Sequence, residues 1–310
     1  MNSRSEEEYL NHNPEGSGAP THSGLRRSLF AASAVKVDRL RFMHIPKTAG
    51  VSFYDCLERI YPGEHFLFTP DTAADLERYA SFDPLTRRQI VLFGGHTPKT
   101  IGENEIDALP VITMLRDPVS RVKSFCQHIR EGKAPPLKDR FPPETFNLDV
   151  FLNSGLERLE NLQTKMLLGR GNFRTFKVPD MEPGLLAERA IDVLANGLVC
   201  FGVMERFDES LMLFKHHLGW GWPVYHRLNA RDESRLLTFE ERHIEKIREL
   251  NSVDIRVYTA ALPIFQERLE AADVTFALFQ FRFRQRLFQM RHEPRPRADK
   301  IRRSGTATRA

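Results

Sequence analysis

The chain has 310 residues, of which 41% are hydrophobic and 10% aromatic, enough to bury one large core. Cys56, Cys126 and Cys200 are odd in number, far apart and in no Cys/His cluster, which argues against a disulfide framework and against a zinc site. A reducing, cytoplasmic compartment fits this cysteine usage, and no metal is expected. Residues 1–34 are polar, with no apolar run long enough for a signal peptide or a membrane span, so we expect a flexible lead-in.

The formal net charge of +4 is unevenly distributed along the chain. Between Arg282 and Ala310 ten Lys and Arg residues stand against two acids, a net +8 that leaves the rest of the chain at −4. The globular part is therefore not a basic body for nucleic acid, and no such partner is expected. The stretch FALFQFRFRQRLFQMR (276–291) fits contact with a membrane surface or an anionic polymer, or else a solvated terminal segment. The expected organisation is a flexible segment 1–34, a domain 35–275 and a basic extension 276–310.

Short apolar runs alternate with helix-patterned stretches along the predicted domain. The runs typical of strands buried on both faces are Leu40–Ile45, Gln89–Phe93, Val111–Leu115 and Leu198–Val203. Apolar residues recur three and four apart in Val51–Ile60, Val119–Arg130, Leu156–Leu168, Phe207–Leu218 and Phe239–Leu250. This alternation predicts an α/β fold with a mostly parallel central sheet covered by helices on both faces. Ligands of such sheets bind at the carboxyl ends of the strands.

The first strand leads into the turn PKTAG (46–50) and then into a helix. The unpaired backbone N–H groups at such a helix start, together with the helix dipole, favour an anion. Lys47 adds a mobile positive charge, Thr48 and Ser52 offer hydroxyl groups, and Gly50 permits close approach of the backbone. This is phosphate-binding chemistry, although the order of residues does not match the G-x-x-x-x-G-K-[ST] loop of ordinary ATP and GTP sites. A plain strand-to-helix turn with an exposed lysine is the alternative.

The stretch PVITMLRDPVSRVKSFCQHIR (110–130) has the same strand-to-helix arrangement. Asp117 suits an N-cap and Pro118 a first helical position, so Arg116 is expected at the same edge of the sheet as Lys47. Ser124, about two helical turns further on, can point back to the same ligand. Two elements that contact phosphate suggest a nucleotide phosphorylated at two places. The alternative is that Arg116 pairs with Asp117 or caps a neighbouring element.

Six motifs follow one another between Leu40 and Tyr258: HIPKTAGVS, LFGGHTP, RDPVSRVKSF, NLQTKMLLG, FGVMERFDESL and LNARDESRLL with the later IRELNSVDIRVY. In this order they resemble the carbohydrate sulfotransferases of family 2, the group that includes heparan sulfate 2-O-sulfotransferases and many bacterial relatives. The resemblance implies a soluble, bacterial-type member with a P-loop NTPase-like three-layer fold. It also implies 3′-phosphoadenosine-5′-phosphosulfate (PAPS) as sulfuryl donor and a hydroxyl group of a carbohydrate or glycolipid as acceptor.

The resemblance also assigns residues to the donor. It implies that the 5′-phosphosulfate is surrounded by Lys47, Thr48, Ala49, Gly50 and Ser52, and that the 3′-phosphate is held by Arg116 and Ser124. The chain departs from the family pattern at Val51, where a threonine is frequent, and at Thr97-Pro98, where some members have a second histidine. A family arginine near the late segment that closes over the donor is displaced, which leaves Asn229 and Arg231 as substitutes.

His96 follows the strand IVLFGG at its carboxyl end, and the resemblance gives this Gly-His motif the role of general base. A neutral imidazole with an ordinary pKa of about 6.5 can take a hydroxyl proton near neutral pH. A structural histidine bonded to backbone is the alternative, and His44, inside a predicted strand, is interpreted as structural. In a loose, in-line transfer Lys47 would neutralise charge on the bridging oxygen. The sulfuryl group carries less charge than a phosphoryl group, so no metal is required.

Two other functions stay open from the sequence alone. One is a kinase or other phosphotransferase built on the same loop and helix, which would require magnesium and a nucleoside triphosphate. The other is a non-catalytic protein that binds polyanions through its basic extension. The motifs do not identify the acceptor, because acceptor selectivity depends on loops such as Ile129–Phe146 that carry no motif.

Overall fold

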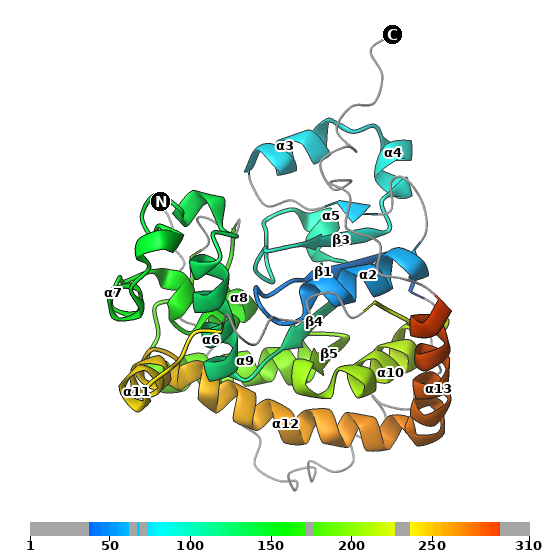
Figure 1. The fold of residues 1–310 in the computed structure, drawn as a ribbon. Helices are drawn as coiled ribbons and strands as arrows, with labels where there is room; N and C mark the ends of the chain where they lie inside the picture. Colours follow the sequence, from blue (N-terminus) through cyan, green and yellow to red (C-terminus); the bar gives the residue numbers. More distant parts are fainter. Residues whose placement is uncertain (1–36, 62–66, 69–72, 172–176, 227–235, 292–310) are drawn as a thin grey trace, which may run out of the picture. The chain divides into compact units, whose positions relative to one another are not determined.

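A parallel sheet forms the centre of the structure (Figure 1). The computed structural model describes residues 37–61, 67–68, 73–171, 177–226 and 236–291. Within them the five strands are β1 (Leu40–Met43), β2 (Leu67–Phe68), β3 (Leu92–Gly95), β4 (Val111–Leu115) and β5 (Cys200–Val203), in the order β2-β3-β1-β4-β5. Every neighbouring pair is parallel, and helices flank the sheet. The predicted α/β fold is confirmed, in an arrangement consistent with a P-loop-like fold.

The four longer strands lie within or overlap the predicted apolar runs, and all of their residues are buried. Burial on both faces explains why these runs are continuously apolar instead of alternating. Two details differ from the prediction. The third strand begins at Leu92, because Gln89 still belongs to the preceding helix, and β2 has no predicted counterpart, because two residues carry no pattern.

Helices follow most of the strands as the sequence predicts. Those with predicted counterparts are α2 (Gly50–Ile60), α6 (Pro118–Arg130), α8 (Leu162–Leu168), α10 (Phe207–Leu218) and α11 (Glu241–Leu250). Those without are α3 (Ala73–Ser81), α4 (Pro84–Gln89), α5 (Asn104–Asp107), α7 (Leu148–Leu152), α9 (Pro183–Asn196), α12 (Ser252–Ala272) and α13 (Thr275–Arg291). Helix α8 starts later than predicted because Asn161 before it is left-handed, with φ of 42°.

An arginine lies inside the apolar first strand. Arg41 is 2% exposed and forms an ion pair with Asp107 at 2.9 Å. Its guanidinium also donates to the carbonyl oxygens of Lys99, at 2.5 Å, and of Pro98. A buried charge is tolerated only when it is paired and hydrogen-bonded, and these partners supply both conditions. The arginine therefore holds the segment that follows β3, which is the segment that carries His96.

Helices α8 and α12 cap each other. Asp254, near the start of α12, accepts hydrogen bonds from the backbone N–H groups of Gln163 (3.0 Å) and Thr164 (2.8 Å) at the start of α8. In return the Asn161 side chain accepts from the backbone N–H groups of Val253 and Asp254, both at 3.0 Å. A buried carboxylate at a helix start satisfies N–H groups that have no partner within the helix. The exchange fixes the position of Gln163.

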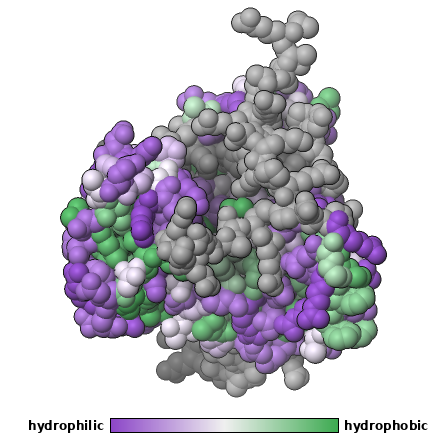
Figure 2. Space-filling view, in the orientation of Figure 1, coloured by the Kyte–Doolittle hydropathy of each residue, from purple (hydrophilic) through white to green (hydrophobic). Residues whose placement is uncertain are grey.

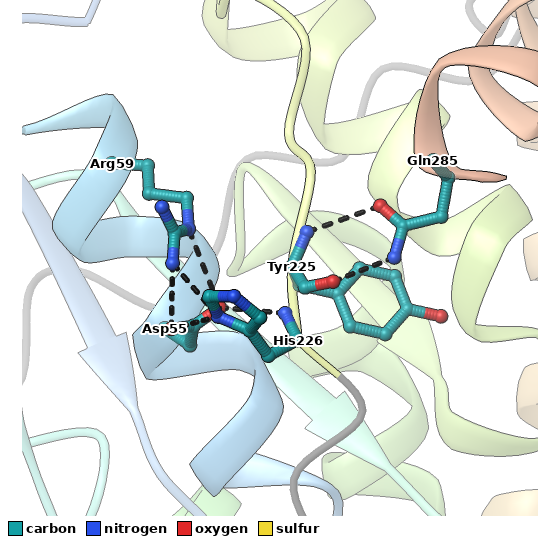
Figure 3. A network of polar contacts seen from close by, with 5 residues as sticks. All are labelled: Asp55, Arg59, Tyr225, His226 and Gln285. Carbon is teal, nitrogen blue, oxygen red and sulfur yellow. Dashed lines mark hydrogen bonds and ion pairs between the residues drawn. The ribbon is translucent and has the colours of Figure 1, made fainter. Parts of the chain in front are cut away.

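Helix α13 is tied to the segment that ends at His226 (Figure 3). The side-chain amide of Gln285 donates to the backbone oxygen of Tyr225 at 2.6 Å and accepts from its N–H at 3.1 Å. On the other side of the segment, the backbone N–H of His226 donates to Asp55 of α2 at 2.7 Å. Phe281 of α13 is fully buried. Tyr225 and His226 are thus held between α2 and α13.

Some predicted features fall on residues that the structure does not describe. These are the flexible segment 1–34, Asn229 and Arg231, and the part of the basic extension beyond Arg291. The domain limits at 35 and 275 stay predictions. Within the described ranges, no helix combines the length and the apolar character needed to cross a membrane.

Replacing Gln285 by alanine should lower the free energy of unfolding by about 1–3 kcal/mol, because the buried N–H and C=O groups of Tyr225 lose their partners. Denaturant unfolding followed by circular dichroism measures the change. Gln289→Ala, at an exposed position one turn further along α13, is the matched control and should be nearly neutral. Equal effects of the two substitutions would contradict the role given to Gln285. Deleting 276–310 in the same assay tests whether that segment is only an extension.

Candidate functional site

The register of the sheet brings the ends of three strands together. Met43 at the end of β1 pairs with Gly95 of β3 on one side and with Thr113 of β4 on the other. The Thr113 hydroxyl donates to the Met43 carbonyl at 2.7 Å, which locks this register. The residues that follow the strands therefore leave at one edge, and the rings of His44 and His96 lie 4.5 Å apart, centroid to centroid.

A cavity of about 450 Å³ lies at this edge. It is lined by most of the predicted site residues, namely Lys47, Ala49, Gly50, Ser52, His96, Arg116 and Ser124. His44 lines it as well, whereas Thr48 is fully buried and is not part of its wall. The structure thus brings both predicted phosphate motifs and the predicted base to one place.

The turn before α2 has an unusual backbone. Lys47 and Ala49 both adopt left-handed conformations, with φ of 73° and 67°. Such conformations are costly for residues with a side chain and persist only where the surroundings enforce them. Left-handed residues in a turn before a helix are typical of backbone concavities that bind anions. The local backbone agrees with the anion-binding turn that the sequence predicts.

The Thr48 hydroxyl, which the sequence analysis offers to a ligand, bonds within the protein instead. The Thr48 hydroxyl donates to the carbonyl oxygen of Ile45 at 2.8 Å, inside the turn. This bond stabilises the turn in which the left-handed Lys47 and Ala49 lie. A contact between the Thr48 hydroxyl hydrogen and a ligand would require the side chain to turn away from Ile45. Ser52, which lines the cavity, is the better placed hydroxyl donor.

Gly50 is required by a histidine that lies against it. A Cβ atom at Gly50 would lie 1.8 Å from Nε2 of His44, far inside van der Waals contact. The His44 ring also packs edge-on against Tyr54, with centroids 5.3 Å apart, and against His96. His44 thus fills the space between the start of α2 and His96. In the sequence analysis, Gly50 is explained by the close approach of the backbone to a ligand. The structure adds a second reason, which is the contact with the His44 ring.

Arg116 connects the two phosphate motifs. Its Nη1 donates to the backbone carbonyl of Lys47 at 3.0 Å, so the end of β4 supports the turn before α2. The Gln163 side chain holds the Arg116 backbone at both groups, accepting from N–H at 3.0 Å and donating to C=O at 2.8 Å. Asp117 caps α6 by accepting from the Ser120 N–H at 2.7 Å, as predicted. The predicted cap is confirmed.

Two arginines that the sequence prediction omits also line the cavity. Arg121 is fully buried and donates to the carbonyl of Arg158 at 3.1 Å. Its Nε and Nη1 have no hydrogen-bond partner among the described residues. Arg121 precedes Ser124 by one helical turn, so helical spacing could have predicted that the two side chains share a face of α6. Arg158 lies in a short 3₁₀ turn (Glu157–Leu159) that carries no motif, so the sequence gives no signal for it.

The charged side chains among the described residues that line the cavity are all cationic. Its lining includes four cationic side chains, Lys47, Arg116, Arg121 and Arg158, and no carboxylate among the described residues. Burial lowers the pKa of Arg121 to about 10, so the guanidinium is still charged at neutral pH. A buried cation is stabilised when an anion with hydrogen-bond acceptors completes its surroundings. The cavity is therefore suited to a ligand with several negative charges.

His96 is neutral at physiological pH. Its pKa is lowered to about 4, first by burial and then by the positive charges of Arg158 and Lys47. His128 in the same cavity has a pKa lowered to about 4, mainly by burial and then by Lys47. A neutral imidazole can accept a proton, and an anion bound beside Lys47 and Arg158 would make His96 a stronger base by offsetting their charges.

A second cavity, of about 380 Å³, adjoins the first. The two share Ala49, Ser52 and Met204 in their walls. The second is also lined by aromatic and charged residues from other elements, among them Phe207, Tyr225, Asp208, Glu209 and Arg282. Tyr225 is the residue held by Gln285 of α13. The position of α13 thus shapes the wall of this second cavity.

No family model matches the chain. The chain is similar to heparan-sulfate 6-O-sulfotransferases. It is 24% identical over 182 residues to heparan-sulfate 6-O-sulfotransferase 1-B of Danio rerio, and 25% identical over 182 residues to heparan-sulfate 6-O-sulfotransferase 1 of Homo sapiens and of Mus musculus. Each match covers 51% of this chain and 44% of the relative, so the chain spans less than half the length of these relatives. The similarity supports a sulfotransferase family, while the closer relation to 2-O-sulfotransferases stays unconfirmed.

Gly50→Ala should lower the free energy of unfolding, because the new methyl group overlaps the His44 ring. Overpacking of this kind costs about 1–3 kcal/mol or more. The double variant Gly50→Ala/His44→Ala removes the ring and should recover at least half of the lost unfolding free energy. Thermal and denaturant unfolding of the wild type, the two single variants and the double variant form a double-mutant cycle. No recovery in the double variant would contradict the contact.

The His96 pKa should be about 4 in the protein alone and should rise when adenosine 3′,5′-bisphosphate is bound, because the nucleotide's charges offset those of Arg158 and Lys47. Histidine signals in NMR spectra, followed over pH, measure this shift. His217 is the control, since its pKa is also lowered to about 4, mainly by burial, but it does not line either cavity. A His96 pKa that the nucleotide leaves unchanged would contradict the site.

Proposed function

We propose that the protein transfers the sulfuryl group of PAPS to a hydroxyl group of a carbohydrate or glycolipid. The similarity to heparan-sulfate 6-O-sulfotransferases supports a transferase of this class. The observation that carries the proposal is the 450 Å³ cavity, in which four cations and a neutral histidine meet at the start of α2 without a carboxylate among the described lining residues. A multiply charged donor and an uncharged proton acceptor fit that combination.

The residues present fit the donor at both of its phosphorylated positions. Lys47, the backbone of the turn and Ser52 would hold the 5′-phosphosulfate. Arg116 and Ser124 would hold the 3′-phosphate, for which a planar guanidinium is well suited. The nucleoside would extend along the shared wall of the two cavities, where Phe207 and Tyr225 offer aromatic surface. Thr48 would contribute through its place in the turn, not through its hydroxyl hydrogen.

The proposed reaction is an in-line displacement at sulfur. The acceptor hydroxyl gives its proton to His96 as its oxygen bonds to sulfur, and the bond from sulfur to the bridging oxygen breaks, releasing adenosine 3′,5′-bisphosphate. The charge that develops on the bridging oxygen is stabilised by Lys47, more strongly in the transition state than before it. His96 enters the reaction unprotonated, because its low pKa keeps it neutral. No metal is assigned a step.

The acceptor is proposed to be a glycan on two grounds. The relatives' names refer to heparan sulfate, and Arg158, whose charge lowers the His96 pKa, is placed to attract a negatively charged acceptor. A cytoplasmic location, with Cys56, Cys126 and Cys200 as free, buried thiols, is part of the same proposal.

Transfer from labelled PAPS to a panel of hydroxylated glycans, measured under single-turnover conditions, tests the proposal. His96→Ala should reduce the rate by on the order of 10²–10⁴-fold, with donor affinity and thermal unfolding close to wild type. Lys47→Ala should also reduce the transfer rate strongly, since it contacts the leaving group. Lys177→Ala, at an exposed site outside both cavities and outside the loop Ile129–Phe146, is the matched control and should keep the wild-type rate.

Three results would contradict the proposal. Near-wild-type turnover of His96→Ala would show that His96 is not the general base. Phosphoryl transfer from a nucleoside triphosphate with magnesium, without sulfuryl transfer, would make the protein a kinase. If the wild-type protein bound the glycan but showed no sulfuryl transfer, the protein would be a glycan-binding protein and not an enzyme.

A further inference from the structure

Helix α13 has a fixed orientation on the domain. Phe281 and Gln285, four residues apart, are buried, and Gln285 bonds to both backbone groups of Tyr225. Phe288 lies against the ring of His226, with centroids 4.8 Å apart, and the Arg59 guanidinium lies 4.7 Å from the centre of the Phe288 ring. These contacts come from one face of α13 and determine which residues its opposite face presents to solvent.

That opposite face carries four large apolar side chains. Phe276, Phe279, Phe283 and Met290 are 70%, 73%, 62% and 75% exposed. Their spacings of three, four and seven residues place them in one line along the helix. Figure 2 shows pale green side chains bordered by purple at the right of the molecule, where α13 lies in Figure 1. We call these four residues the Phe stripe.

Arginine borders the Phe stripe. Arg286 and Arg291, both exposed, lie on opposite sides of it by helical geometry. Helix α13 contains four arginines and no acidic residue between Thr275 and Arg291. An apolar line with cations along its margins is the arrangement that lies flat in a membrane interface, with aromatic rings among the acyl chains and guanidinium groups at lipid phosphates.

We propose that α13 docks the protein onto an anionic membrane surface through the Phe stripe. The helix would lie parallel to the surface, because its packed face contacts α10 and, through Phe288 and Arg59, α2, and no described helix is suited to span a membrane. This binding is peripheral and reversible, and it does not depend on the proposed reaction.

The charges and the apolar line together favour a membrane over two other partners. A second copy of the chain would bring four arginines against four arginines, with no acid on α13 to pair them. A polyanionic glycan would engage the arginines but would gain nothing from four exposed apolar side chains. A bilayer with anionic headgroups satisfies both features.

The test is co-sedimentation of the full chain with vesicles of phosphatidylcholine, with and without phosphatidylserine. The wild type should bind the anionic vesicles, and binding should weaken with salt and on removal of phosphatidylserine. Phe279→Ser/Phe283→Ser should weaken binding by on the order of tenfold or more, because two rings no longer leave water. Leu85→Ser/Val150→Ser changes two similarly exposed apolar residues on α4 and α7 and should bind as wild type does.

Circular dichroism and thermal unfolding verify that each variant is folded. The proposal is overturned if the wild type does not bind anionic vesicles, or if the Phe279/Phe283 variant binds them as well as the Leu85/Val150 variant. It is also overturned if the protein binds soluble heparin but not anionic vesicles, and if the Phe279/Phe283 and Leu85/Val150 variants bind heparin with equal affinity. That result would identify a surface for polyanions. Self-association that the Phe279/Phe283 change removes, without vesicle binding, would identify a second copy as the partner.

Discussion

The parallel pairing of β1 with both β3 and β4 is the constraint on which the site depends. Met43 lies between Gly95 and Thr113, and the Thr113 hydroxyl bonds to the Met43 carbonyl. A shift of one residue in either ladder would turn successive side chains to opposite faces and separate the groups that now meet. The turn before α2, His96 and Arg116 converge because three parallel strands end at one edge of the sheet.

Buried polar networks hold that edge in place. Arg41 fixes the carbonyls after His96, and Gln163, itself positioned by Asp254, fixes the backbone of Arg116. Each network satisfies groups that would be costly to leave unpaired in the interior. The cavity differs, because its cations, Arg121 among them, have no carboxylate among the described lining residues. We interpret this cationic lining as the structural counterpart of an anionic ligand.

The sequence is informative where local chemistry decides the structure. Continuous apolar runs locate four strands, and residue order places Lys47 and Arg116 at one edge. It is less informative where distant contacts decide. Pro263 interrupts the pattern of α12, which nonetheless continues as one helix. Helix α13 has apolar residues on two opposite faces, which obscures its period. The close approach of His44 to Gly50 and the inward bond of the Thr48 hydroxyl depend on tertiary geometry alone.

Calorimetric titration with adenosine 3′,5′-bisphosphate and with adenosine 5′-monophosphate tests whether the cations at the sheet edge bind a nucleotide phosphorylated at two positions. The bisphosphate should bind more tightly by about 1.5–3 kcal/mol for each charge-assisted contact to the extra phosphate, and Arg116→Ala should remove most of that difference. Equal affinities for the two nucleotides in the wild-type protein would contradict the account.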